Sequence, residues 1–340
     1  MVPQKHNVSL SVNVCRTDAA FLDKTLRHIT RALNYPFAER IVAYDPGSVE
    51  GRFRGRGEED NAKLCKMLAG LLSDGIIDRV DEIPWAEDQV HAVIAKYFGD
   101  KHVKLKDFSG APVYQYLFAI DRCSANYVLH VDSDMLFHCA SSRPWIDLAI
   151  ERMQQDSRLA IAVPRAGPPQ AQNWLERVCG RPLFRSLNTG WHRSETVSTR
   201  YFLLDSNRFQ KCLLPLVQKN PGEALEDTLT NTLNARGFEI WSLRDLDNWA
   251  VHPFEHDANF ITHLDDLIWG VEEGLYPFVR DGRYWDIITA GKSVETWLNA
   301  IRRARRRRAS EQTTNPARRR GGGSATERRI LETNDKDLPH

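Results

Sequence analysis

The sequence predicts an α/β protein with a mostly parallel central sheet flanked by helices. Short runs rich in β-branched residues, the first at 8–14, alternate with amphipathic segments of helical period in the first half of the chain. A strand, a helix and a second strand in this order form the parallel crossover unit. No linker-like stretch occurs before residue 302, so we expect one domain over residues 1–301.

The elements of the first half follow from their periodicity. A helix is expected from about Asp18, a plausible N-cap, because four apolar residues follow at helical spacing: Leu22, Leu26, Ile29 and Leu33. Further helices are expected at 58–74, 89–98 and 112–124. Strands are expected at 40–45, 76–83 and 127–131, and the last of these is entirely apolar apart from His130.

The second half of the chain has no regular alternation of expected strands and helices. We expect helices at 145–155, 208–218, 223–236 and 293–308, and strands at 159–163, 201–204 and 238–243. Gly237 fits the position just beyond the end of the helix at 223–236. The stretch 164–198 is polar, contains glycine and proline, and is too long for an ordinary connection, so it is expected to be a functional loop region.

Composition narrows the class of protein. The longest apolar run stays below 18 residues, and the N-terminal residues lack the apolar core of a signal peptide, so neither a transmembrane helix nor a leader is predicted. The six cysteines are scattered without a CxxC pair, which disfavours a zinc site or a disulfide framework. Reduced, mostly buried thiols in a cytoplasmic protein are the simplest interpretation.

The net charge of +1 conceals an asymmetry. Residues 302–340 contain twelve Lys or Arg and five Asp or Glu and so carry +7, which leaves −6 on the other 301 residues. An acidic body is not typical of a nucleic-acid-binding core. The basic tail is expected to be disordered. It is either a solubilising extension or a peripheral contact with an anionic surface, such as the inner face of a membrane.

The most informative motif is Asp132-Ser133-Asp134, directly after the apolar strand at 127–131. In open α/β sheets, ligands bind at the carboxyl ends of the strands, and Asp45 and Asp205 also follow expected strands. An acid pair at a strand end can simply form a solvated turn. Here the two acids lie between apolar segments, where unpaired carboxylates are costly, and a hard cation such as Mg²⁺ or Mn²⁺ would remove that cost.

The absence of glycine from the first turn is equally informative about the kind of ligand site. The turn after the first strand, Cys15-Arg16-Thr17-Asp18, has no glycine, and the first glycine of the chain is Gly47. The sequence therefore lacks both a GxGxxG fingerprint and a P-loop there. If the fold binds a nucleoside diphosphate, a cation held by carboxylates is the natural replacement for the missing backbone cradle.

Two further groups are candidates for a site. Glu226 and Asp227 lie near the start of an expected helix, where acids often favour the helix dipole, but one of them could also be a general base. His252 and His256 lie close together beside Trp249 and could contribute a metal or phosphate ligand.

These residues together resemble the A-type glycosyltransferases, particularly the inverting family 2 group, over roughly residues 8–256. The resemblance implies a Rossmann-like nucleotide-diphospho-sugar transferase (GT-A) fold and a metal-dependent hexosyltransferase activity of class EC 2.4. It implies a nucleotide-sugar-binding half at 8–135 and an acceptor-binding half at 136–301. The donor would be a UDP-sugar or GDP-sugar. The acceptor, whether a saccharide, a lipid-linked group or a protein, stays open.

The resemblance also implies roles for individual residues. Asp45 would contact the base of the nucleotide, with Arg16 and Thr17 lining the same pocket. Asp132 and Ser133 would lie near the donor, and Asp132 and Asp134 would bind Mn²⁺ or Mg²⁺ as the DxD motif. His252, or alternatively His256, would complete the metal site. Asp227 would be the catalytic base, with Glu226 beside it.

The sequence departs from the family pattern in places. Pro46-Gly47-Ser48 follows Asp45, Leu225 precedes the Glu-Asp pair, and 186–199 matches no subfamily. A nucleotidyltransferase also uses paired carboxylates and a cation, but it usually carries a glycine-rich phosphate loop that is missing here. A methyltransferase is disfavoured for the same reason. A scaffold that binds a nucleotide-sugar without catalysis is the remaining alternative.

Overall fold

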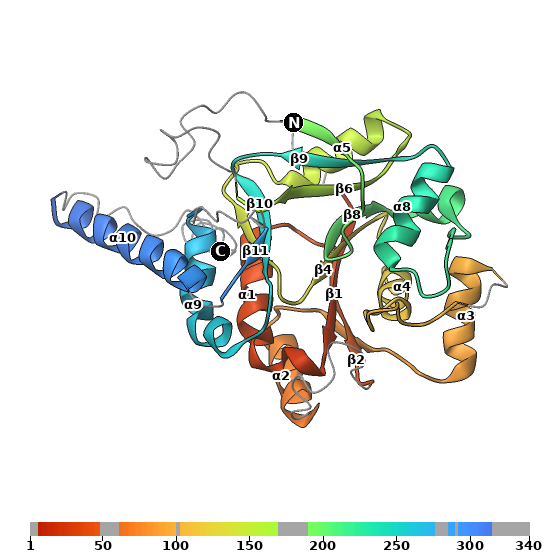
Figure 1. Ribbon diagram of the computed structural model, residues 1–340, viewed down its shortest axis with the longest axis horizontal. Coiled ribbons are helices and arrows are strands. Elements are labelled where there is room, and N and C mark those ends of the chain that lie inside the picture. Colours follow the sequence, from red (N-terminus) through yellow and green to blue (C-terminus); the bar gives the residue numbers. More distant parts are fainter. Residues whose placement is uncertain are drawn as a thin grey trace, which may run out of the picture.

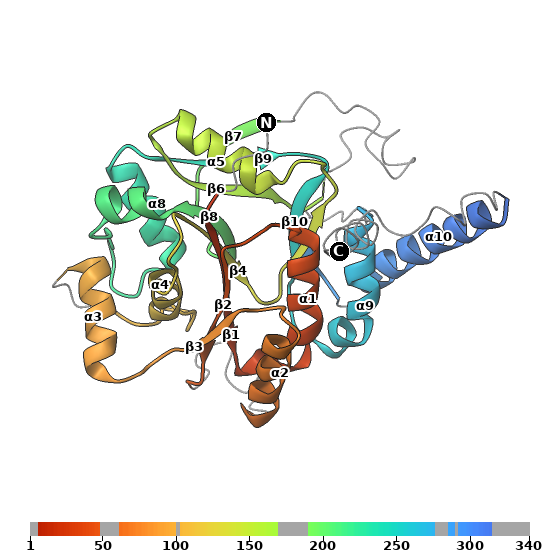
Figure 2. The same ribbon diagram turned by 180° about the vertical axis from the view of Figure 1, so that it is seen from behind.

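In the computed structural model, a central sheet has helices on both faces (Figure 1, Figure 2). The structure describes residues 6–47, 61–99, 103–168, 190–275, 285–289 and 292–314. The path of the sheet contains eight strands: β1 (Val8–Cys15), β2 (Glu39–Asp45), β3 (Arg79–Glu82), β4 (Tyr127–Asp132), β6 (Leu159–Ala166), β8 (Tyr201–Asp205), β10 (Asn248–Pro253) and β11 (Asp286–Ile287). Three more strands pair beside it: β5 (Leu136–Cys139), β7 (Gly190–Ser194) and β9 (Glu239–Arg244).

The helices pack against this sheet. They are α1 (Leu22–Leu33), α2 (Asn61–Ser73), α3 (Glu87–Phe98), α4 (Tyr114–Asp121), α5 (Trp145–Gln155), α8 (Leu225–Ala235), α9 (Ala258–Glu272) and α10 (Lys292–Thr314). Shorter turns are η1 (Arg16–Ala20), α7 (Ser206–Arg208) and the π-helical η3 (Phe209–Leu213). Figure 1 shows α3, α4 and α8 to one side of β1 and β4, and α1 and α9 to the other. Figure 2, seen from behind, agrees.

The strand order is β11-β10-β6-β8-β4-β1-β2-β3. Strands β3, β2, β1 and β4 are parallel neighbours, whereas β8 runs antiparallel to both β4 and β6. The predicted fold class is therefore confirmed as an α/β architecture with a mostly parallel central sheet flanked by helices.

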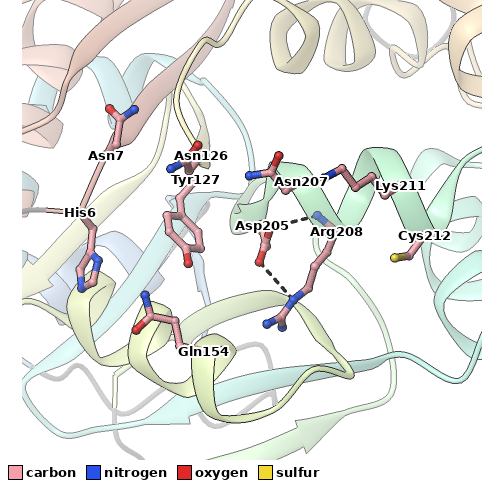
Figure 3. Close-up of a pocket in the computed structure, with 10 residues that line it drawn as sticks. All are labelled: His6, Asn7, Asn126, Tyr127, Gln154, Asp205, Asn207, Arg208, Lys211 and Cys212. Atoms are coloured by element: carbon pink, nitrogen blue, oxygen red, sulfur yellow. Dashed lines mark hydrogen bonds and ion pairs between the residues drawn. The ribbon is translucent and has the colours of Figure 1, made fainter.

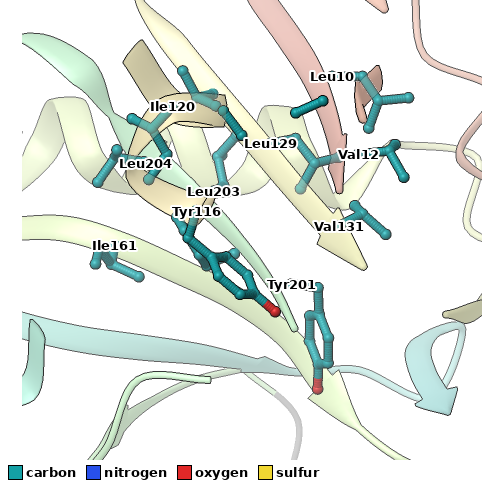
Figure 4. Packing of buried hydrophobic residues seen from close by; sticks show 14 of the residues in the cluster. Leu10, Val12, Tyr116, Ile120, Leu129, Val131, Ile161, Tyr201, Leu203 and Leu204 are labelled. Carbon is teal, nitrogen blue, oxygen red and sulfur yellow. The ribbon is translucent and has the colours of Figure 1, made fainter. Parts of the chain in front are cut away.

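Buried apolar side chains explain why the parallel strands read as apolar runs. Leu10 and Val12 of β1 lie beside Leu129 and Val131 of β4 in the cluster shown in Figure 4. Parallel strands covered on both faces bury nearly every side chain. The apolar stripe predicted for α1 is confirmed, because its four members are buried: Leu22, Leu26, Ile29 and Leu33.

Some local predictions are corrected. Asp18 does not cap α1, which begins after Phe21; it lies inside η1 and accepts a hydrogen bond from the Cys15 backbone at 3.0 Å. The helix expected at 208–218 is only the short α7 and η3, because Pro215 ends the segment. Strands β5, β7, β10 and β11 were not predicted, since short strands depend on their partners more than on local sequence.

The start of the basic tail is also corrected. Residues 302–308 were expected both as the end of a helix at 293–308 and as the start of a disordered tail; they are helical, and α10 continues as far as Thr314. The helix forms because Val294, Trp297, Leu298 and Ile301 give it a buried apolar face, which contacts α9. Within the described residues, every helix is too short or too polar to cross a membrane.

One buried histidine connects α1 to the chain beyond Asp134. The backbone N–H of Phe137 donates to His28 Nε2 at 2.8 Å, and His28 Nδ1 lies 2.8 Å from Glu272 Oε1. The imidazole must be neutral to accept from Phe137. Burial lowers the pKa of His28, although Glu272 opposes that effect.

The lowered pKa predicts a dependence of stability on pH. Because the folded-state pKa of His28 lies below its unfolded value, its contribution is complete above that unfolded value and is lost as the pH falls below it. His28→Leu should cost about 1–3 kcal/mol near neutral pH, because it leaves a buried N–H unpaired. The difference from wild type should shrink towards pH 5.

Denaturant unfolding measured between about pH 7.5 and pH 5 tests this. His91→Leu on α3 is the control, since His91 is exposed. A difference between wild type and His28→Leu that stays constant with pH would show that His28 does not titrate on unfolding.

Candidate functional site

Four parallel strands bring the predicted donor-binding residues to one edge of the sheet. In the register of β1, Cys15 lies opposite Asp45 of β2 and Asn13 lies opposite Asp132 of β4. The turn that holds Arg16 and Thr17 therefore lies between the two acids. This is the carboxyl edge, where ligands bind in sheets of this type.

Asp132 ends β4 and is held by an aromatic neighbour. The Tyr116 hydroxyl on α4 donates to Asp132 Oδ1 at 2.7 Å, and His130 Nε2 lies 3.5 Å from the same oxygen. Burial, and then the charge of Asp132, raise the pKa of Tyr116, so the phenol stays a donor at neutral pH. The Asp132 side chain is 19% exposed, which leaves it accessible to a ligand.

Asp134 is ionised and only half satisfied. Its Oδ2 lies 2.9 Å from His256 Nε2, whereas its buried Oδ1 has no hydrogen-bond partner among the described residues. Burial raises its pKa, but His256, and then the charges of Arg200 and His252, outweigh burial and lower the pKa to about 2. A buried carboxylate oxygen without a partner is costly, and a cation would stabilise it.

Ser133 joins the turn after β4 to the turn after β1. Its Oγ donates to Asp18 Oδ2 at 2.7 Å. Asp18 also accepts from the Cys15 backbone at 3.0 Å and from Thr17 Oγ1 at 3.0 Å. Burial is the main cause of the raised pKa of Asp18. Its role in the site was missed because an acid before a helix fits an N-cap equally well.

Asp45 is surrounded by donors. Its Oδ1 accepts from the Gly47 backbone at 2.7 Å and from Trp85 Nε1 at 3.0 Å, and its Oδ2 accepts from Gln115 Nε2 at 3.0 Å. A Cβ at Gly47 would lie 2.8 Å from Asp45 Oδ1, so only glycine fits this turn. Trp85 and Gln115 were not predicted, because neither belongs to a recognisable motif.

Arg16 and Thr17 lie in the η1 turn beside these acids. Arg16 Nε is buried and has no hydrogen-bond partner. Thr17 Oγ1 is 3.0 Å from Cys15 Sγ and donates to Asp18. Thr17 therefore supports the turn, whereas Arg16 keeps a donor available.

The two acids of α8 have different surroundings. Glu226 Oε1 accepts from both the backbone N–H and the hydroxyl of Thr199, each at 3.1 Å. Asp227 is exposed, one helical position further on. Thr199 precedes Arg200, whose carbonyl accepts from the Asp132 backbone at 2.7 Å. Thr199 and Arg200 thus connect Glu226 to the end of β4.

The two histidines are also distinguished by their contacts. His256 contacts Asp134 and packs 4.5 Å, centroid to centroid, from Phe21. His252 Nε2 instead lies 2.9 Å from Asp286 Oδ1 of β11, and its Nδ1 lies 2.9 Å from the Pro253 carbonyl. Of the two, His256 is the one in contact with the DxD motif.

The donor set fits a divalent cation that substrate and water would hold in part. Within the described residues, no cluster of three or more His, Cys, Asp or Glu side chains is close enough to enclose a metal. Mg²⁺ and Mn²⁺ often take one or two carboxylates and complete their shell with phosphate oxygens and water. The unpartnered Oδ1 of Asp134 and the accessible Asp132 suit that arrangement.

Asp205 lies at the opposite edge of the sheet and is not part of this site. Because β8 is antiparallel, Asp205 pairs with Tyr127 at the start of β4. It caps α7 through the Arg208 backbone at 3.0 Å and pairs with Arg208 Nε at 3.2 Å. A cavity of about 540 Å³ opens at this edge, and its lining includes Tyr127, Asp205 and Lys211 (Figure 3).

Comparisons with known proteins give distant likenesses in structure alone. No protein-family model and no curated protein sequence matches the chain. Similar solved structures include "GalNAc-T7 with UDP, GalNAc and Mn²⁺", at 11% identity and a TM-score of 0.44 over 74% of this chain. Another is a mycobacterial protein, at 10% identity and a TM-score of 0.37, covering 78% of this chain and 73% of that one. The chain spans only 44% of the GalNAc-T7 chain.

Proposed function

We propose that the protein is a glycosyltransferase that moves a sugar from a nucleoside-diphosphate donor to an acceptor hydroxyl. The observation that carries the proposal is the buried, ionised Asp134 at the carboxyl edge of the sheet, whose Oδ1 has no hydrogen-bond partner in the part of the chain that the structure describes. Asp45, with Trp85 and Gln115 around it, offers a polar and aromatic setting for the nucleotide base at the same edge.

Asp134 and Asp132 would hold Mn²⁺ or Mg²⁺, with His256 preferred over His252 as a third ligand because it contacts Asp134. The cation would offset the negative charge that develops on a departing diphosphate. Without it, the carboxylates at this edge would repel the donor.

Asp227 is the proposed catalytic base. Its carboxylate is exposed at the first turn of α8, whereas Glu226 beside it is held by Thr199. Asp227 would take the proton of the acceptor hydroxyl as the acceptor oxygen bonds to the anomeric carbon. The bond from that carbon to the diphosphate oxygen breaks, and its electron pair leaves with the diphosphate. Direct displacement inverts the anomeric configuration; a retained configuration in the product would exclude it.

Donor binding is tested by thermal unfolding with UDP or GDP, each with and without Mn²⁺. A ligand at 100 times its dissociation constant stabilises the folded state by about 2.7 kcal/mol. We expect a metal-dependent rise in melting temperature for one nucleotide, and its loss in Asp134→Asn, because the cation loses a ligand. Asp88→Asn, an exposed acid on α3, is the control.

Chelation of the metal from the wild-type protein should remove the same shift and does not depend on how the variant folds. No shift with any nucleoside diphosphate would refute the proposed donor. A shift with UDP or GDP but no hydrolysis or transfer of a sugar nucleotide would favour a non-catalytic scaffold. Release of pyrophosphate when a nucleoside triphosphate and a sugar phosphate are supplied would favour a nucleotidyltransferase.

The base is tested with Asp227→Asn and Glu226→Gln. Asp227→Asn should lower turnover of the donor by roughly 10²- to 10⁴-fold, because proton transfer is lost, while nucleotide affinity is unchanged. Glu226→Gln keeps an oxygen that can accept from Thr199, so it should lower turnover far less. The assay is release of nucleoside diphosphate from the sugar nucleotide. Near wild-type turnover in Asp227→Asn would disprove the assignment.

The basic end of α10 is the proposed contact with an anionic membrane surface. Arg305 and Arg308 pair with Asp266 and Glu273 of the protein itself. Arg303, Arg306 and Arg307 are exposed and have no ion-pair partner among the described residues, and Figure 1 shows this end projecting from the body.

Sedimentation with vesicles of phosphatidylglycerol and phosphatidylcholine tests this contact. We expect binding to the anionic vesicles only, and its loss when Arg303, Arg306 and Arg307 are all replaced by Glu, since each basic residue near such a surface contributes about 1 kcal/mol. Lys66→Glu, an exposed site on α2, is the control. If the triple variant sediments with the anionic vesicles as well as Lys66→Glu does, α10 does not bind the membrane surface in the proposed way.

A further inference from the structure

Arg200 lies immediately beside Asp132, across the antiparallel pair of β4 and β8. Val131 is opposite Tyr201, and the next backbone N–H, that of Asp132, donates to the Arg200 carbonyl at 2.7 Å. The side chains of directly opposed residues share a face of the sheet, with Cβ atoms about 5 Å apart. Arg200 and Asp132 are therefore neighbours at the carboxyl edge.

That face is the one covered by α4. Two residues before Asp132, the His130 ring packs 5.2 Å from Phe202 and 4.8 Å from Tyr116, centroid to centroid. Because alternate residues of a strand share a face, Asp132 and Arg200 continue this row towards the open edge. Tyr116 closes the row from α4 by donating to Asp132.

The backbone around Arg200 is fixed on both sides. Thr199 donates twice to Glu226, and the Arg200 carbonyl accepts from Asp132. The residue is thus held between the end of β4 and the first turn of α8, the two places where the proposed donor and acceptor chemistry occurs.

Within the described part of the chain, the guanidinium of Arg200 forms no close ion pair. Among the described residues, its guanidinium has no acid within 4.0 Å and donates no side-chain hydrogen bond, although Arg208 and Arg40 pair closely with acids. Burial lowers the pKa of Arg200, but the negative charges around it, first those of Asp134 and Asp132, outweigh burial and raise the pKa. The group stays cationic and faces a set of acids without pairing with any of them.

A diphosphate entering this edge would meet several carboxylates. Asp132, Asp134 and Glu226 are all within the electrostatic reach of Arg200. A guanidinium presents a planar fork of donors that matches phosphate oxygens, and it is always charged. An unpaired arginine in that position can bind the phosphate groups and also lessen the repulsion from the acids.

We propose that Arg200 binds the diphosphate of the donor from the β8 side of the site, opposite the first turn of the chain. This assignment rests on the proposed function, because it takes the ligand to be a nucleoside diphosphate. It makes Arg200 a substrate-binding residue that acts on the phosphates and has no contact with the nucleoside.

Calorimetric titration of Arg200→Met, Arg200→Lys and wild type tests the proposal, with UDP and GDP and with uridine and guanosine, in Mn²⁺. We expect Arg200→Met to weaken binding of the diphosphate by about tenfold to a hundredfold, as for a lost hydrogen bond to a charged group. Binding of the matching nucleoside should change less than about twofold. Arg200→Lys should fall between, because it keeps the charge but not the fork.

Arg193→Met is the matched control, since Arg193 is an exposed arginine on β7, the strand that precedes β8 in the chain. Unchanged affinity for the diphosphate in Arg200→Met would overturn the proposal. Equal weakening of diphosphate and nucleoside would also overturn it, because that is the signature of a structural arginine that only neutralises buried acids. If wild type binds neither diphosphate, the proposed function itself fails, and that result is visible before any variant is compared.

Discussion

The geometry of the candidate site depends on one buried hydrogen bond, from the Ser133 hydroxyl to the carboxylate of Asp18. Asp18 closes the turn after β1, and Ser133 lies in the turn after β4, so this bond joins two loops that are 115 residues apart. Without a glycine in the first turn, the backbone cannot form a phosphate cradle there, and a carboxylate organises the turn instead. The position of Asp132 and Asp134 relative to Arg16 and Thr17 follows from that link.

The balance of charge at this edge is the second constraint. Asp134 is held ionised although it is buried, because His256, Arg200 and His252 lie around it. Burial raises the pKa of Asp18, and the hydrogen bonds from Cys15 and Ser133 and the charge of His256 oppose that effect without outweighing it. The pKa values of Asp18 and Asp134, which reach this edge from loops far apart in the sequence, are thus shifted in opposite directions, because the charges around Asp134 outweigh its burial.

The sequence predicted the parts of the fold that are encoded locally. The apolar stripe of α1 and the run that ends at Asp132 are strong signals, because burial on one or both sides leaves a pattern in the chain itself. The direction of β8 leaves no such pattern, so Asp205 was grouped with the wrong edge. Arg200 and Asp18 were missed for the same reason: their roles arise from pairing with distant residues, and an arginine before a strand or an acid before a helix is locally unremarkable. The separate contacts of His252 and His256 likewise required the tertiary structure.

The reversed direction of β8 has a consequence for how the site could change over time. Strands β1, β2 and β4 deliver one wall through their carboxyl ends, whereas Thr199 and Arg200 deliver the other wall through the amino end of β8. The two walls therefore belong to chain segments that enter the edge from opposite directions, and the hydrogen bond from the Asp132 backbone N–H to the Arg200 carbonyl joins them. Substitutions just before β8 can reshape one wall while the register of the parallel strands is preserved. In this fold, one wall of the site is tied to the register of the parallel strands and the other to the segment that leads into β8.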